Sequence, residues 1–172
     1  MTTETIEAAI IVRATARAKE TGVEARLADR LADRELRGVL RNFATEAQRE
    51  AIDLRRSFLE AAAVCALLVD HPADVVSRAE RAIRGIDPAD VRALRQIAQA
   101  IATPVARSTD PDLRRVDGVA KRRVWESSPS GDALELLGFV RLDHSSVSSG
   151  REAFLCVTAR GELLIEILRD WK

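Results

Sequence analysis

The segment from Ser130 to Lys172 constrains the fold most, because its short elements follow one another in a fixed order. A short helix at 132–137 is followed by a β-forming segment at 139–143, a serine-rich tip at 144–150 and a second β-forming segment at 151–157. A longer helix at 158–168 comes last. β-Branched and aromatic residues favour strands, and a small polar segment between two strands favours a hairpin. The segment therefore predicts a short helix, a β-hairpin and a final helix.

Two residues in this segment fit special positions at helix ends. Gly138 can end the short helix in a conformation with positive φ, which glycine adopts at no steric cost. Thr158 can accept a hydrogen bond from the first turn of the last helix and so serve as its N-cap.

Upstream, the pattern of apolar residues predicts helices. Residues 2–20 place apolar side chains at every fourth position and arginines on another face, and Gly22 is a candidate stop. The apolar positions are Ile6, Ile10, Ala14 and Ala18, and the arginines are Arg13 and Arg17.

A second helix is predicted over 23–43. It contains a tandem Leu-Ala-Asp-Arg at 27–30 and 31–34, which we interpret as the exposed charged face of an amphipathic helix. The spacing of Thr45 and Gln48 is typical of a capping box and predicts the start of a third helix. Residues 58–69 of that helix are apolar almost all round, which predicts a central helix covered by the first two helices or by a second subunit.

Two prolines predict further helix starts. Pro72 suits the first turn of a helix over 73–84, and Asp87 with Pro88 predicts a helix that runs to Ala102. Residues 103–129 are less regular and leave alternatives open: a short helix at 112–116 and an extended segment at 119–125 both fit.

Composition limits the classes of partner and compartment. The chain has 27 basic and 27 acidic residues, so no overall field attracts nucleic acid or membrane. Cys65 and Cys156 lie in apolar runs, as in proteins of a reducing compartment. The N-terminus lacks the pattern of a signal peptide, and the longest apolar run, 61–69, is far shorter than a membrane span. These features predict a cytoplasmic protein.

Patterns typical of catalysis or metal binding are absent from the sequence. His71, His144, Cys65 and Cys156 do not have the spacing of a zinc site. Neither a phosphate-binding glycine loop nor a Gly-x-Ser-x-Gly nucleophile elbow occurs. We therefore expect a non-enzymatic protein without metal or cofactor.

The C-terminal segment resembles the wing region of MarR- and PadR-like winged-helix proteins. Residues 134–140, Leu-Glu-Leu-Leu-Gly-Phe-Val, are similar to the end of their recognition helix, and 157–164, Val-Thr-Ala-Arg-Gly-Glu-Leu-Leu, to the exit from their wing. The resemblance covers about 130–172 and implies a winged helix. Such motifs indicate a fold better than a function.

A fainter resemblance, over about 70–170, is to bacterial proteins of the abortive-infection alpha type. It rests on His71-Pro72, on 86–90 (Ile-Asp-Pro-Ala-Asp), on Leu137-Gly138-Phe139 and on 157–161 (Val-Thr-Ala-Arg-Gly). This resemblance implies a protein associated with phage defence.

A winged helix raises the question of DNA binding, and the charges suggest how this chain would do it. The short helix carries Asp132 and Glu135, which would repel phosphate. Positive charge lies elsewhere, in a basic cluster near Trp125 and on the predicted hairpin. The candidate nucleic-acid-binding residues are Lys121, Arg122, Arg123, Arg141 and Arg151.

Taken together, the sequence predicts a mainly α-helical protein with an N-terminal helical region, 1–85, and a winged-helix-like domain, 86–172. We expect a homodimer that forms through the N-terminal helices and contacts DNA phosphates, as a regulator or defence factor. The alternative is a protein–protein interaction module whose winged helix does not bind DNA. A third possibility is ligand sensing in a cleft between the two regions.

Overall fold

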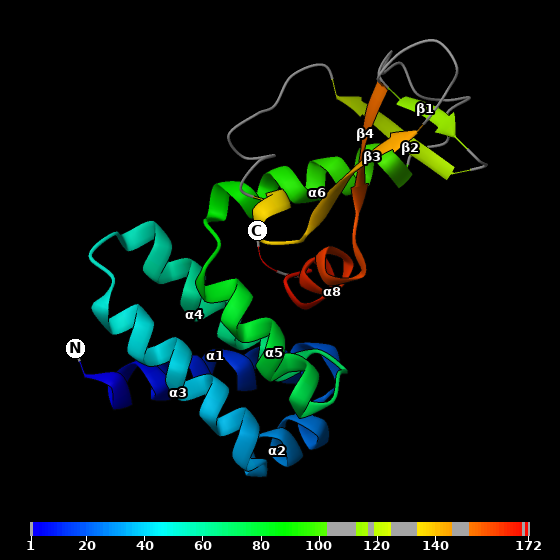
Figure 1. The fold of residues 1–172 in the computed structure, drawn as a ribbon. Helices are drawn as coiled ribbons and strands as arrows, with labels where there is room; N and C mark the ends of the chain where they lie inside the picture. The colour runs from blue at the N-terminus through cyan, green and yellow to red at the C-terminus, as the bar shows by residue number, and fades with distance from the viewer. Residues whose placement is uncertain are drawn as a thin grey trace. The chain divides into compact units, whose positions relative to one another are not determined.

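The computed structural model describes residues 2–102, 113–116, 119–124, 134–145, 152–169 and 171, and it is mainly helical (Figure 1). The chain forms two compact units. The first, here called the helical unit, contains Met1–Pro88 and Glu166–Lys172. The second, the sheet unit, contains Ala89–Ile165. The division after Pro88 lies close to the predicted boundary at 85, but the assignment of Glu166–Lys172 to the helical unit was not anticipated.

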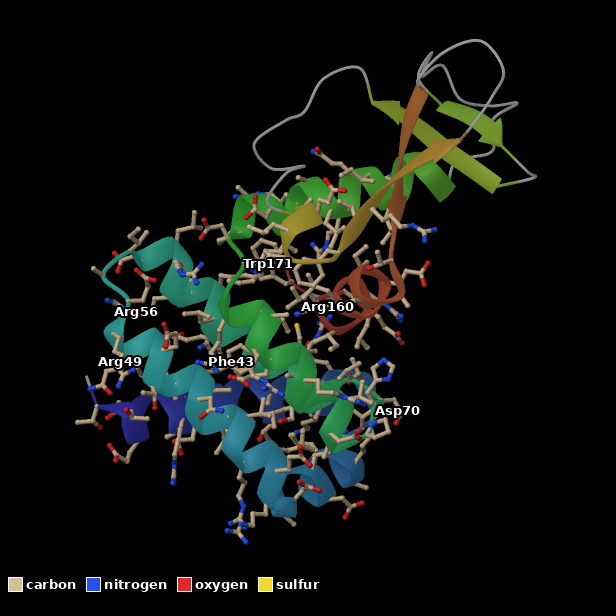
Figure 2. The ribbon with its side chains drawn as sticks, in the orientation of Figure 1. Phe43, Arg49, Arg56, Asp70, Arg160 and Trp171 are labelled. Carbon is tan, nitrogen blue, oxygen red and sulfur yellow. The ribbon has the colours of Figure 1, made fainter. Side chains whose placement is uncertain are left out.

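The helical unit is built from five helices and Glu166–Lys172, from here on called the C-terminal segment. The helices are α1 (Thr3–Thr21), α2 (Glu24–Ala32), α3 (Arg34–Arg49), α4 (Asp53–Leu68) and α5 (Ala73–Arg84). α3 and α4 pack against each other and against α1, and α5 packs on α3. Phe43 and Phe58, both fully buried, are among the largest side chains of this core (Phe43 is labelled in Figure 2).

The first helix confirms the prediction made for it. Ile6, Ile10, Ala14 and Ala18 form its buried face, and the spacing of four residues keeps them on one side. Gly22 ends the helix with φ of 69°, and its N–H bonds the carbonyl oxygen of Ala18. The left-handed conformation at this position explains why glycine occupies it.

The single helix predicted over 23–43 is wrong, because the chain breaks at Asp33 into α2 and α3. The Asp33 carboxylate accepts hydrogen bonds from the N–H groups of Glu35 and Leu36, at 2.7 and 3.0 Å, and so caps α3. The interpretation of the tandem repeat as an exposed face is also wrong for Arg30, which is only 9% exposed. Its guanidinium donates to the carbonyl oxygens of His71 and Ala66, at 2.8 and 2.9 Å.

The capping box predicted at Thr45 and Gln48 is wrong as well, since both residues lie inside α3. The helix ends after Arg49, and α4 begins at Asp53. Arg56 closes this connection by donating to the carbonyl oxygens of Glu50 and Ala47 (Figure 2). The connection is therefore held by an arginine rather than by a hydroxyl cap.

The predicted central helix is α4, but only one of its faces is in the core. Its buried face consists of Phe58, Leu59, Ala62, Ala63, Ala66 and Leu67. Ala61, Val64, Cys65 and Leu68, on the other side, are partly exposed. Core packing therefore explains the apolar residues on the buried face, but not those on the partly exposed side.

Both helix starts predicted from proline are confirmed. α5 begins after Pro72, and α6 begins at Pro88 and ends at Ala102. Arg55 on α4 joins the end of α5 to the start of α6, because it donates to the carbonyl oxygen of Ile86 at 2.9 Å and to the Asp87 carboxylate at 2.7 Å.

The sheet unit contains α6 and a four-stranded antiparallel sheet. The strands are β1 (Leu113–Val116), β2 (Val119–Val124), β3 (Val140–Ser145) and β4 (Glu152–Val157), in the order β1-β2-β4-β3. The open question over 112–125 is thereby answered: residues 113–116 form a strand rather than a helix, and 119–124 are extended. Helix α8 (Ala159–Ile167) follows β4 and starts in this unit.

The residues just before β3 and just after β4 are hydrogen-bonded to each other. Gly138 has φ of 73°, as predicted, and its carbonyl oxygen accepts a hydrogen bond from the Thr158 hydroxyl at 2.7 Å. The Thr158 oxygen also accepts from the N–H of Gly161 at 3.2 Å, which confirms it as the N-cap of α8. Arg160 adds a cation–π contact to the buried Phe139, 5.3 Å from the ring centroid.

Within the parts of the chain that the structure describes, no helix is both long and apolar enough to cross a membrane.

Candidate functional site

The sheet unit contains the five residues predicted to bind nucleic acid, and two neighbouring residues of β3 differ in exposure. Val140 is buried and Arg141 is exposed. Successive residues of a strand alternate between faces, and residues paired across strands share a face. The face that contains Arg141 is therefore called the outer face, and the register assigns further residues to it.

The register brings three of the five predicted residues to the outer face. Asp143 shares this face with Arg141 and pairs with Phe154, which in turn pairs with Arg123 on β2. Lys121 lies two residues from Arg123 and so belongs to the same face. Arg114 on β1 pairs with Lys121 and adds a fourth basic residue.

The other two predicted residues are not part of this group. Arg122 pairs with Leu155, which pairs with Leu142, and this row belongs to the opposite face together with Val140. Arg151 lies outside the described residues, as does Trp125. Two acidic residues, Asp143 and Glu152, share the outer face with the basic ones, so the local charge is mixed.

The predicted recognition helix is described only in part. Residues 134–136 are helical, and Asp132 lies outside the described residues. Leu134 is buried, whereas Glu135 is exposed and Leu136 is 89% exposed. The Glu135 carboxylate and the exposed Leu136 side chain are poor contacts for phosphate.

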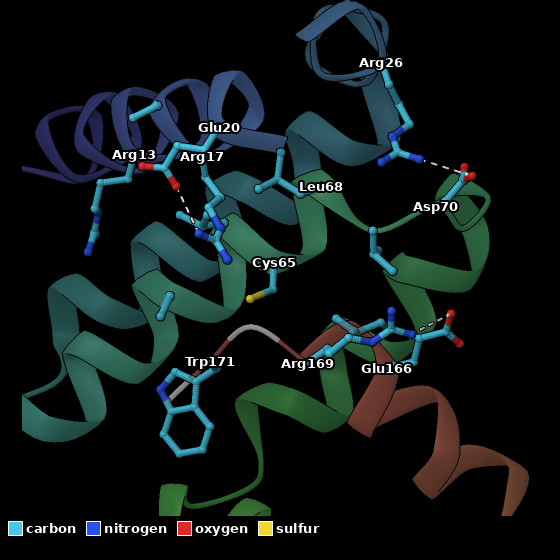
Figure 3. A pocket seen from close by; sticks show the side chains of 15 residues that line it. Arg13, Arg17, Glu20, Arg26, Cys65, Leu68, Asp70, Glu166, Arg169 and Trp171 are labelled. Carbon is cyan, nitrogen blue, oxygen red and sulfur yellow. Dashed lines mark hydrogen bonds and ion pairs between the residues drawn. The ribbon is translucent and has the colours of Figure 1, made fainter. Parts of the chain in front are cut away.

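The helical unit contains a cavity of about 540 Å³ that sequence reasoning missed (Figure 3). Its apolar lining comes from Ala16 on α1, from the partly exposed side of α4, from Val69 just after α4, and from the C-terminal segment. The apolar lining residues are Ala16, Ala61, Val64, Cys65, Leu68, Val69, Ile167 and Trp171. Trp171 packs edge-on against Phe58, with ring centroids 4.8 Å apart, and this contact holds the C-terminal segment at the cavity.

Charged side chains also line the cavity. Arg13 and Arg17 come from α1, Arg26 from α2 and Arg169 from the C-terminal segment. The sequence had indicated that Arg13 and Arg17 form a separate face of the first helix. It contained no local signal that residues 166–171 would return to α4, and this return is what completes the cavity.

Two buried charged groups lie elsewhere in the helical unit. Desolvation lowers the pKa of Arg30, and the neighbouring Arg26 adds to this effect. Burial raises the pKa of the Glu80 carboxyl on α5, against the opposing effect of Arg84, with which it forms an ion pair. Arg30 joins α2 to α4 and to the turn at His71, and Glu80 pairs within α5, so we assign both groups structural roles.

The described residues contain no cluster of three or more histidine, cysteine or acidic side chains that could hold a metal ion. His71 Nε2 instead lies 3.0 Å from the Glu166 carboxylate.

A scan of the chain against protein-family models found no match, and searches of the curated proteins and of the solved structures found none either.

Proposed function

We propose that the protein is a non-enzymatic DNA-binding protein that contacts duplex phosphates through the outer face of its sheet. The observation that carries the proposal is the register, which gathers Arg114, Lys121, Arg123 and Arg141 on one face. Cationic side chains on one surface can follow a phosphate backbone without reading base edges. Under this proposal the short helix is scaffold.

The proposal includes a winged-helix-like domain over 86–172. Its support is the order of a short helical segment, an antiparallel β3–β4 pair and a final helix, together with the fastening of Gly138 to Thr158. We further propose a role as a regulator or phage-defence factor, which rests on the two sequence resemblances alone.

A titration of labelled duplex DNA by fluorescence anisotropy tests the first step. Each neutralised phosphate contributes about −0.9 to the slope of log K against log salt, so three or four contacts predict a slope of about −3 to −4. The triple variant Lys121→Gln, Arg123→Gln, Arg141→Gln should reduce the magnitude of that slope, to a value between about −1 and 0. Absence of binding to random duplex at low salt and micromolar protein would reject the proposal.

The matched control is Arg122→Gln, which removes one cation from the same strand but from the opposite face. It should leave both affinity and salt slope unchanged, provided that circular dichroism shows a folded protein. Arg78→Gln, on an exposed ion pair of α5 in the helical unit, serves as a second control. An equal loss in Arg122→Gln and in Arg123→Gln would contradict the assignment of faces.

A second candidate function is protein binding through the short helical segment, and the exposure of Leu136 favours it. An exposed leucine beside an exposed glutamate suits an interface better than a phosphate surface. Under this alternative, a purified chain retains its partner after nuclease treatment, and Leu136→Glu abolishes the capture. Loss of the captured partner after nuclease treatment would count against this alternative.

We also propose that the chain forms a homodimer through its N-terminal helices, on which Val12 of α1 is 68% exposed. Analytical ultracentrifugation over a range of concentrations tests this proposal, with Val12→Glu as the disrupting variant. A monomer at every concentration would refute it.

A further inference from the structure

We propose that the cavity of the helical unit is a binding site for an amphipathic monocarboxylate, a molecule with an apolar body and a single carboxylate group. The cavity lies entirely within this unit, and none of the residues proposed to contact DNA lines it. The proposal is therefore independent of the proposed function.

The apolar part of the site is a helix face that the core does not use. Residues 58–68 of α4 are apolar almost all round, and the core face of the helix is filled by six residues that are essentially inaccessible. Val64, Cys65 and Leu68 on the other side remain partly exposed and line the cavity. A helix of this composition is normally covered on most sides. A cavity of about 540 Å³ lies within the range of roughly 300–1,000 Å³ that small-molecule sites occupy.

The polar part consists of arginines whose ion pairs are easily exchanged. Arg17 pairs with Glu20 at 3.0 Å, one turn along α1, and both side chains are about half exposed. Arg26 pairs with Asp70 at 3.1 Å, and the Asp70 side chain is 86% exposed (Figure 3). Exposed pairs of this kind contribute little to stability, because water solvates both partners almost as well.

Arg26 is the arginine that we assign to the ligand carboxylate. Its side chain lines the cavity, is partly exposed, and pairs through Nη1 with the exposed Asp70. A carboxylate accepts from a guanidinium through two parallel hydrogen bonds. A ligand carboxylate could therefore replace Asp70 on the terminal nitrogens of Arg26.

The carboxylates of the lining favour a ligand with one negative charge over a ligand with several. Four arginines line the cavity, and three carboxylates, Glu20, Asp70 and Glu166, line it as well. A polyphosphate or a dicarboxylate would meet these carboxylates and be repelled. A single carboxylate can displace one of them from an arginine, while the apolar body covers Val64 and Leu68.

Isothermal titration calorimetry of the full chain with octanoate, 1-octanol and acetate tests this assignment. Octanoate carries both parts of the proposed ligand, whereas octanol lacks the charge and acetate lacks the apolar body. We expect octanoate to bind at least about tenfold more tightly than either. Equal affinity for octanoate and octanol, or no octanoate binding at millimolar concentration, would overturn the proposal.

Three variants locate the binding. At least one of Arg26→Gln and Arg17→Gln should weaken octanoate about tenfold and leave octanol unchanged, because only the charged contact is removed. Val64→Phe should weaken both by filling the cavity. Arg78→Gln, an exposed arginine paired with Asp74 and absent from the lining, is the control and should bind as the parent does.

The arginine variants keep the test decisive if Val64→Phe does not fold. Octanoate binding that is unaffected by Arg26→Gln and Arg17→Gln would place the ligand elsewhere and reject the site. Because the DNA titration uses different residues, its failure would not be confused with failure of this proposal.

Discussion

A Cβ atom on Gly161 would overlap the carbonyl oxygen of Phe139 and lie 2.8 Å from Cγ1 of Val157. The first turn of α8 therefore rests directly on the backbone at the start of β3, and only glycine allows this approach. The same backbone oxygen accepts the N–H of Thr158 at 3.0 Å. The two halves of the C-terminal sequence motif thus contact each other, which explains the glycine at position 161; the glycine at position 138 is explained by its positive φ.

Gly161→Ala should destabilise the sheet unit by about 1–3 kcal/mol, because the added methyl group meets backbone that must move. Hydrogen exchange of the α8 amides, together with urea unfolding, measures the loss. Gly38→Ala in α3 is the matched control: a Cβ atom there would have nothing within 4 Å, so alanine should stabilise by about 0.5–1 kcal/mol. Equal effects of the two substitutions would contradict the close approach.

Thr158→Val should cost about 1–2 kcal/mol, since valine keeps the shape but loses the hydrogen bonds to Gly138 and Gly161. Thr158→Ser retains the hydroxyl and should lose less than half as much. Urea unfolding followed by circular dichroism compares the two. If serine and valine were equally destabilising, the hydroxyl would not be the stabilising group.

Arg30→Gln should destabilise the helical unit by about 2–3 kcal/mol, because two charge-assisted hydrogen bonds to backbone carbonyls are lost. Arg34→Gln provides the comparison: Arg34 occupies the corresponding position of the next Leu-Ala-Asp-Arg repeat but is exposed. Its substitution should change the free energy of unfolding by less than about 0.5 kcal/mol. Thermal unfolding of both variants measures the difference.

Glu80 should make stability depend on pH. Burial raises the pKa of its carboxyl in the folded state, so the folded protein retains this proton to higher pH than the unfolded chain does. Its contribution is then fully present below the unfolded pKa, about 4.3, and is lost as pH rises through the folded pKa. Glu80→Gln cannot titrate and removes this dependence.

The measurement for Glu80 is urea unfolding of the parent and of Glu80→Gln between about pH 4 and pH 7. The free energy of unfolding of the parent, relative to the variant, should fall as the pH is raised. A difference that stays constant or grows with pH would show that burial does not dominate at this carboxyl.

Features that depend on neighbouring residues were predictable from the sequence. The stripe from Ile6 to Ala18 repeats at every turn of one helix, and the proline at the start of α6 and the N-cap at Thr158 each act within one turn of chain. The break at Asp33 was local too, but the repeat concealed it, because two Leu-Ala-Asp-Arg units in series have the period of a continuous helix. Asp33 caps α3 rather than lying on a charged face.

Features that depend on distant residues were not predictable. Arg30 is buried because carbonyl groups 36 and 41 residues away accept its hydrogen bonds. The cavity forms because Trp171, beyond the end of α8, meets Phe58 on α4, and no periodicity in the sequence encodes that contact. On the sheet, the basic residues 121–123 were recognisable as a cluster, but only the register separates Arg122 from Lys121 and Arg123.

The assignment of Glu166–Lys172 to the helical unit has a consequence for synthesis on the ribosome. Residues 89–165 are inserted in the sequence of the helical unit, so they leave the ribosome before Glu166–Lys172, the last segment of that unit. Until Trp171 emerges, the partly exposed side of α4 and the Phe58 ring lack the contacts that this segment makes. Nascent chains that stall before residue 166 should therefore be the form that chaperones bind most strongly, because apolar surface is then accessible.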